Sequence, residues 1–156
     1  MQDRQLYAEI LGIKGPWFVE RVEARLEQGE VPLYLDHAEV QRWECSECGR
    51  PCPLYDHQPE RQRCHLDTCQ YRIMLHARPP RSDCSEHGVR AVKLAWAEAS
   101  SRFTALLKRL AIDWLHAASQ KAVGENLGLS WEAIHGMMER AVSRAERGAV
   151  AAAGSG

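Results

Sequence analysis

Apolar and polar side chains alternate in two neighbouring stretches near the start of the chain. The first runs from residue 17 to 26 and the second from 31 to 36, with the polar tetrapeptide 27–30 between them. Period-two alternation is typical of half-buried strands, so the two stretches predict a β-hairpin. Before it, residues 3–11 place Leu6 and Ile10 on one side and predict a short helix that ends at Gly12.

A third alternating stretch lies further along, where Tyr71, Ile73, Leu75 and Ala77 alternate with more polar residues. It predicts a strand that ends before the pair of prolines at 79–80, because proline cannot continue a ladder of backbone hydrogen bonds. A second strand is predicted after Gly88, through residues 89–93, as its partner. The middle of the chain is therefore expected to be a small β unit.

After Trp96 the apolar period becomes helical. Ser100 or Ser101 is expected to cap a helix whose apolar stripe contains Phe103, Leu106, Leu107, Leu110, Ala111, Trp114 and Leu115. A second helix is predicted over 119–127, and Ser130 is expected to cap a third. The third helix would turn five residues inward: Trp131, Ile134, Met138, Ala141 and Ala145.

The last two predicted helices fit a helix-turn-helix. Gly124 supplies a small residue where the helices cross, and Gly128 lies in the turn, with apolar residues at the corner: Val123, Leu127, Leu129 and Ile134. The start of the second helix of such a unit enters the major groove of DNA. The DNA-facing candidates here are Lys121, Ser130, Trp131, Glu132, His135, Arg140 and Arg144. An ordinary helical bundle with a Leu-Gly turn remains the alternative.

The net charge of −1 hides an uneven distribution. Residues 1–60 hold six Lys/Arg against twelve Asp/Glu, whereas residues 61–156 hold fourteen against nine. A basic half indicates a surface that meets a polyanion. Around the middle unit the candidates for phosphate contacts are Arg61, Arg63, Arg72, Arg78, Arg81, Arg90 and Lys93.

Two short motifs carry the clearest chemistry. Cys45 and Cys48 are separated by two residues and followed by glycine, and Cys84 and His87 repeat this layout. Three cysteines and one histidine form a closed tetrahedral zinc site of the structural kind, because no position is left for water. The spacing therefore predicts one structural Zn²⁺ and no catalytic metal.

Other thiols and imidazoles leave some alternatives open. Cys52 could compete with Cys48 for the ion, and His57 or His65 could act as ligands. A disulfide between Cys64 and Cys69 is not favoured, since six cysteines without a secretion signal indicate a reducing compartment. With no apolar run long enough to cross a bilayer, we expect a cytoplasmic protein, nucleoid-associated when bound to DNA.

Together these features predict an α+β fold, in which a zinc-ribbon-like β domain with an N-terminal hairpin precedes a three-helix unit. The expected domains are 1–40 (helix and hairpin), 41–96 (zinc-binding β domain), 97–147 (helix-turn-helix) and 148–156 (disordered tail or linker). No arrangement of nucleophile, base and open metal position is present, so the chain is not expected to be an enzyme or to take a small-molecule substrate.

Several short motifs occur in an order that resembles one family. They are Leu11-Gly12-Ile13, the first Cys pair with its glycine, Tyr55-Asp56-His57, the segment His65 to Gln70, Pro80-Arg81, the Cys84–Val89 segment, Trp96-Ala97-Glu98, Ser101 to Thr104, and Leu129-Ser130-Trp131. From Leu11 to about Arg147 the chain is similar to the amino-terminal part of the ISL-three family of bacterial insertion-sequence transposases. It departs from the family pattern at Arg63 and Cys64, before His-Leu-Asp, where an aromatic and a basic residue are expected.

The resemblance implies a function. In that family a zinc-binding segment and a helix-turn-helix precede a DDE catalytic domain and bind the terminal inverted repeats of the element as double-stranded DNA. It implies Cys45, Cys48, Cys84 and His87 as ligands and residues 119–145 as the helix-turn-helix. No catalytic residue can be transferred, because no three-carboxylate site is found here. Paired element ends suggest a homodimer on DNA, and the alternative is a stand-alone regulator or interaction adaptor derived from a transposase.

Overall fold

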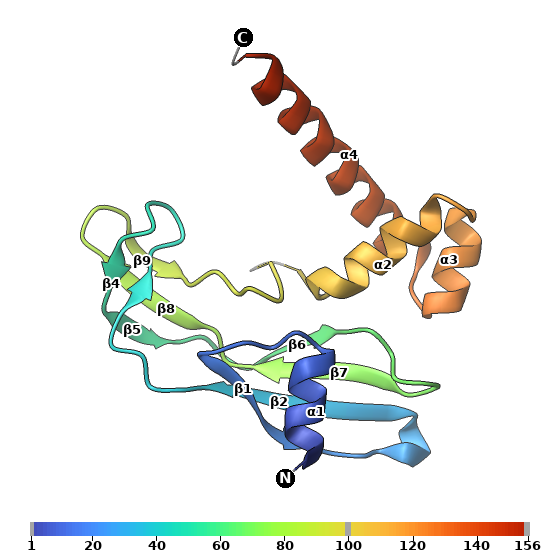
Figure 1. Cartoon of the computed structure of the whole chain (residues 1–156), viewed down its shortest axis with the longest axis horizontal. Helices are drawn as coiled ribbons and strands as arrows, with labels where there is room; N and C mark the ends of the chain where they lie inside the picture. Colours follow the sequence, from blue (N-terminus) through green and yellow to red (C-terminus); the bar gives the residue numbers. More distant parts are fainter. Residues whose placement is uncertain (1, 99–100, 155–156) are drawn as a thin grey trace. The chain divides into compact units, whose positions relative to one another are not determined.

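The computed structural model describes residues 2–98 and 101–154, which form two compact units, 1–106 and 107–156. Figure 1 shows that the first unit is mostly β and the second is helical. The predicted α+β class is confirmed, because a β-rich part precedes three helices. The predicted domain boundaries at residues 40, 96 and 147 stay a prediction.

The hairpin predicted near the start is present. Helix α1 (Gln2–Ile10) precedes β1 (Trp17–Val22) and β2 (Glu30–His37), which pair antiparallel with Trp17 opposite His37. The first strand is shorter than predicted, because the chain forms a 3₁₀ turn, η1 (Leu26–Gln28), before Gly29. The φ of Gly29 is +67°, a left-handed value that glycine adopts without strain.

The main sheet has the strand order β1-β2-β7-β6, with β6 at Arg61–Cys64 and β7 at Arg72–Ala77. Strand β7 runs parallel to β2, with Val31 beside Ile73 and Leu33 beside Leu75. These side chains are at most 5% exposed and form the core of the first unit. A strand with neighbours on both sides has a buried face, which accounts for the apolar alternation of β7.

The expected pairing of β7 with the strand after Gly88 is wrong. That strand, β9 (Gly88–Ala91), pairs with β8 (Pro80–Cys84), which also pairs with β5 (Leu54–His57) in a separate three-stranded sheet. The chain leaves the main sheet at the two prolines, so the residues after them join another sheet. A short hairpin, β3 (Trp43–Glu44) with β4 (Pro51–Cys52), lies between the two sheets in sequence.

The first helix of the C-terminal part begins later than the sequence indicates. Helix α2 spans Ala105–Leu115, and Phe103 instead pairs with Cys64 in an isolated β-bridge. Ser101 does not cap α2: its hydroxyl accepts a hydrogen bond from the Phe103 N–H at 3.1 Å. Ser100, the other proposed cap, lies outside the described residues.

The remaining helices are α3 (Gln120–Leu127) and α4 (Trp131–Ala153). Ser119 and Ser130 cap them, each accepting a backbone N–H bond at 3.2 Å, so the cap predicted at Ser130 is confirmed. Helix α4 includes residues 148–153, which were expected in a disordered tail or linker. Its buried residues are Ala133, Ile134 and Met137, whereas Trp131 is 55% exposed, so the predicted inward positions of Trp131 and Ala145 are wrong.

None of the described helices combines the length and the apolar character that a bilayer span requires.

Candidate metal centre and helix-turn-helix

The first two ligands lie at the tip of the β3–β4 hairpin. Gly49 has φ +71°, and its N–H donates to the Cys45 carbonyl at 2.9 Å, so the chain reverses immediately after Cys48. The Cys45 N–H donates to the Arg50 carbonyl at 2.9 Å and closes the turn. Glycine is required here because a side chain at this φ would be strained.

The other two ligands lie where β8 turns into β9. Cys84 ends β8 and pairs with Gly88, whose φ is +69°. His87 lies within this turn and is half-buried, while Cys84 is 2% exposed. The two turns therefore repeat one backbone design, as the matching sequence motifs predicted.

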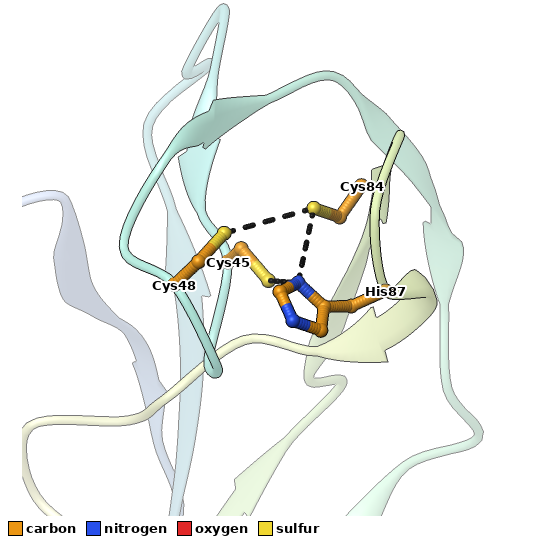
Figure 2. A group of neighbouring side chains, drawn as sticks. All are labelled: Cys45, Cys48, Cys84 and His87. Atoms are coloured by element: carbon orange, nitrogen blue, oxygen red, sulfur yellow. Dashed lines mark hydrogen bonds between the residues drawn. The ribbon is translucent and has the colours of Figure 1, made fainter.

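The four side chains converge on one point (Figure 2). Their ligand atoms all lie within 4.8 Å of one another. The Cys84 Sγ is 3.8 Å from the Cys48 Sγ and 3.6 Å from the His87 Nδ1, and the Cys45 Sγ is 3.9 Å from the same nitrogen. Ligands around tetrahedral zinc are separated by about 3.5–3.8 Å, given bond lengths of about 2.0–2.3 Å.

The electrostatics of Cys84 also suit a metal ligand. Backbone N–H groups of Glu86 and His87 and the His87 side chain lower the pKa of its thiol to about 6. The thiolate is the form that binds metal, so this thiol is ready to coordinate at neutral pH. The four residues hold a structural zinc ion, and with every position taken by protein the metal has no open site for chemistry.

The alternative ligands lie elsewhere. Nε2 of His57 is 2.8 Å from Nε2 of His37, and Nδ1 of His65 is 2.5 Å from the Thr104 hydroxyl. Cys64 and Cys69 are free thiols, in agreement with the expectation against a disulfide. Cys52 is buried beside Cys45 and Cys84 but is not one of the four clustered ligands.

The α3–α4 corner has the close packing of a helix-turn-helix. A Cβ added at Gly124 would lie 2.9 Å from the Leu129 carbonyl oxygen and 3.6 Å from Cγ1 of Ile134, so a side chain has no room. The Leu129 N–H donates to the Gly124 carbonyl at 2.9 Å. Gly128 ends α3 with φ +63°, as the Leu-Gly turn predicted.

Comparison with known families agrees with both sites. Residues 25–87 match the zinc-finger of transposase IS204/IS1001/IS1096/IS1165, and residues 92–142 match the helix-turn-helix domain of transposase family ISL3. The chain belongs to the ISL3 transposase family. Among ISL3-type relatives, the transposase for insertion sequence element IS1001 of Bordetella parapertussis is 30% identical over 137 residues, which is 86% of this chain.

A second relative is the transposase for insertion sequence element IS1557 of Mycobacterium tuberculosis, which is 30% identical over 105 residues, or 66% of this chain. The chain spans 33% of the length of the first relative and 23% of the second. No solved structure matches the chain. The family assignment therefore rests on sequence and agrees with the metal cluster and the α3–α4 corner.

The candidate DNA-binding residues of the helical unit lie around α3 and the start of α4. Trp131 stacks on His135 with ring centres 4.5 Å apart, and Nε2 of His135 is 3.4 Å from Glu139. Lys121 is exposed, 3.9 Å from Glu125. Ser130 uses its hydroxyl in the helix cap, and three further candidates are exposed on α4: Glu132, Arg140 and Arg144.

In the first unit, four of the candidate cations are exposed: Arg72, Arg78, Arg90 and Lys93. Arg81 differs, because its Nε donates to Oδ1 of Asp56 at 2.6 Å and a second nitrogen donates to Oδ2. The Arg81 hydrogen bonds lower the pKa of the Asp56 carboxyl, so the pair stays ionised at neutral pH.

The prediction that Arg63 contacts phosphate is wrong, because its side chain is 1% exposed. Its Nε donates to the Ser101 carbonyl at 2.9 Å, and its guanidinium lies 5.4 Å from the centre of the Trp96 ring. This arginine holds the segment before α2 against the end of β6. The departure from the family pattern at this position thus concerns packing.

Sequence reasoning missed a group of cations beside the first metal-binding turn. Lys14 and Arg42 line a pocket of about 400 Å³ together with Lys93 and Trp43. The cations come from three segments that are far apart in the chain, so no sequence motif indicated their proximity. Two carboxylates, Glu44 and Glu47, also line this pocket.

Buried His65 makes stability depend on pH. Burial lowers its pKa from 6.5 to about 4, so in the folded chain it stays neutral where the unfolded chain binds a proton. Stability from this group is complete above pH 6.5 and falls as the pH drops towards 4. Between pH 7 and 5, we expect His65→Gln to lose less unfolding free energy than the wild type, by about 1–3 kcal/mol. Urea unfolding at each pH measures this.

The control for that experiment is His116→Gln, since His116 is exposed on the helical unit. It should keep the wild-type dependence on pH. Any effect of proton binding on the zinc ligands is common to all three proteins and cancels in the comparison. Parallel curves for wild type and His65→Gln would contradict the assignment.

Proposed function

We propose that this chain is a sequence-specific double-stranded-DNA-binding part of an ISL3-family transposase, acting on the terminal inverted repeats of its element during transposition. The observation that carries the proposal is the α3–α4 corner, where Gly124 brings its helix into contact with the Leu129 carbonyl and Ile134. This close crossing is what a helix-turn-helix needs in order to present its second helix to a major groove.

The start of α4 would read the bases. Trp131, Glu132 and His135 lie on its first turns, and the stacking of Trp131 on His135 fixes both rings. A histidine or glutamate can hydrogen-bond to a base edge, and a tryptophan can contact a thymine methyl group or the sugar-phosphate backbone. These residues are therefore proposed to set the preference for one DNA sequence.

Exposed cations would bind the phosphates. Arg140 and Arg144 lie further along α4, and the first unit adds Arg72, Arg78, Arg90 and Lys93. Phosphate contacts position a protein on DNA without reading its sequence, and each one makes binding more sensitive to salt. The metal centre would support this surface by holding β8 and β9, on which Arg90 lies. A homodimer on paired ends belongs to the same proposal.

A binding assay separates the two roles. Fluorescence anisotropy with a duplex of the element's end, against a shuffled duplex at several salt concentrations, should show preference for the end. Arg140→Ala/Arg144→Ala should weaken binding to both duplexes by roughly tenfold or more and reduce the salt dependence by about one unit per contact. His135→Ala should instead reduce the preference between duplexes.

Arg4→Ala is the matched control, because Arg4 is an exposed arginine on α1 outside the proposed surface. It should leave both affinities unchanged. Equal binding of the wild type to the end and to shuffled DNA would overturn the proposed specificity.

A further inference from the structure

A fourth thiol adjoins the metal centre without belonging to it. Cys52 ends β4, opposite Trp43 of β3, and is 5% exposed. It forms one buried cluster with Cys45 and Cys84, two of the zinc ligands. The strand that follows the first metal-binding turn therefore returns this thiol to the ligands.

A shared carbonyl fixes the thiol to the same turn. The Cys52 Sγ lies 3.3 Å from the Arg50 carbonyl oxygen, which also accepts the Cys45 N–H at 2.9 Å. Cys45 and Cys52 are thus held by one backbone group on the two sides of the hairpin. The position of Cys52 is set by the same hydrogen bonds that position the first ligand.

The contrast with Cys48 is informative. Cys48 is a ligand but is exposed, whereas Cys52 is buried and is not a ligand. An exposed thiolate at the tip of a turn is the ligand that solvent, oxidants and competing chelators reach first. Loss of Cys48 would leave two thiolates and one imidazole around the ion, with a thiol already packed against both remaining cysteines.

We propose that Cys52 is a reserve zinc ligand that replaces Cys48 when the Cys48 sulfur is lost, so that the ion keeps three thiolates and one imidazole. In the exchange, the bond from the metal to Cys48 breaks and one from the Cys52 sulfur forms, as the Cys52 thiol releases its proton to solvent. The spacing favours this, because Cys52 is joined to Cys45 through the short hairpin that already holds both residues.

Cobalt substitution tests the exchange in the intact chain. The intensity of sulfur-to-Co²⁺ charge transfer rises with the number of bound thiolates. Cys52→Ser should match the wild type, and Cys48→Ser should also keep the three-thiolate intensity. The double variant Cys48→Ser/Cys52→Ser should fall by about one third and bind zinc at least tenfold more weakly than Cys48→Ser. Cys64→Ser, which changes a half-buried thiol outside the cluster, should match the wild type.

The opposite result is equally clear. If Cys48→Ser already shows the two-thiolate intensity, and adding Cys52→Ser changes neither the spectrum nor the zinc affinity, Cys52 is no ligand and the proposal fails. Should serine at position 52 disturb folding, as judged by circular dichroism of the zinc-loaded chain, Cys52→Ala supplies the same comparison. None of these readouts depends on DNA binding, so they stand apart from the proposed function.

Discussion

Replacing Cys84 with serine is expected to abolish tight zinc binding and to unfold the β8–β9 turn and the β3–β4 hairpin. Cys84 is 2% exposed and its sulfur lies 3.8 Å and 3.6 Å from two other ligand atoms. Structural zinc contributes about 10–16 kcal/mol of apparent binding energy, which equals or exceeds the whole stability of a typical domain. Metal analysis should give well below one zinc per chain, and thermal unfolding should lose cooperativity.

A strong chelator added to the wild type should reproduce the effect, because it removes the same ion. Cys69→Ser is the control, since Cys69 is exposed and outside the cluster. That variant should retain one zinc and the wild-type melting curve. A folded Cys84→Ser protein without metal would show that the ion is dispensable for this fold.

Gly124→Ala is expected to destabilise the helical unit although alanine is the better helix former. The gain in helix propensity is about 1 kcal/mol, but the new Cβ would lie 2.9 Å from the backbone oxygen of Leu129. A backbone atom cannot rotate away, so α3 and α4 must move apart, at a cost of about 1–3 kcal/mol beyond that gain. We expect a lower melting temperature, by about 4 °C or more, and weaker binding to the element's end.

Gly148→Ala provides the comparison on the neighbouring helix. Gly148 lies within α4, and a Cβ there meets no atom within 4 Å. The substitution should leave stability unchanged or raise it slightly, because nothing offsets the propensity gain. If the two alanine variants melted alike, the close crossing at Gly124 would not be important for stability.

Local motifs made the metal centre and the helical corner predictable. Two ligands separated by two residues and followed by glycine specify a turn, and Gly49 and Gly88 both have the positive φ that this requires. Ser130 and Gly128 mark the end of one helix and the start of the next through their own hydrogen bonds and backbone angles. In each case the residues that determine the structure are within a few positions of one another.

Pairings between distant segments were not predictable in the same way. Nothing local indicates that β2 pairs with β7, because alternation shows which face of a strand is buried but not which strand lies beside it. The burial of Arg63 likewise depends on carbonyls of Glu98 and Ser101, which come much later in the chain. Charge alone made this arginine a surface candidate, and tertiary contacts decided otherwise.

The parallel ladder between β2 and β7 limits how this protein can be divided. A fragment started just before the first cysteine pair would carry every zinc ligand, yet β7 would lose the neighbour that covers Ile73 and Leu75 along one edge. Exposed strand edges of this apolar kind promote aggregation. A soluble minimal zinc-binding fragment should therefore begin upstream of Trp17.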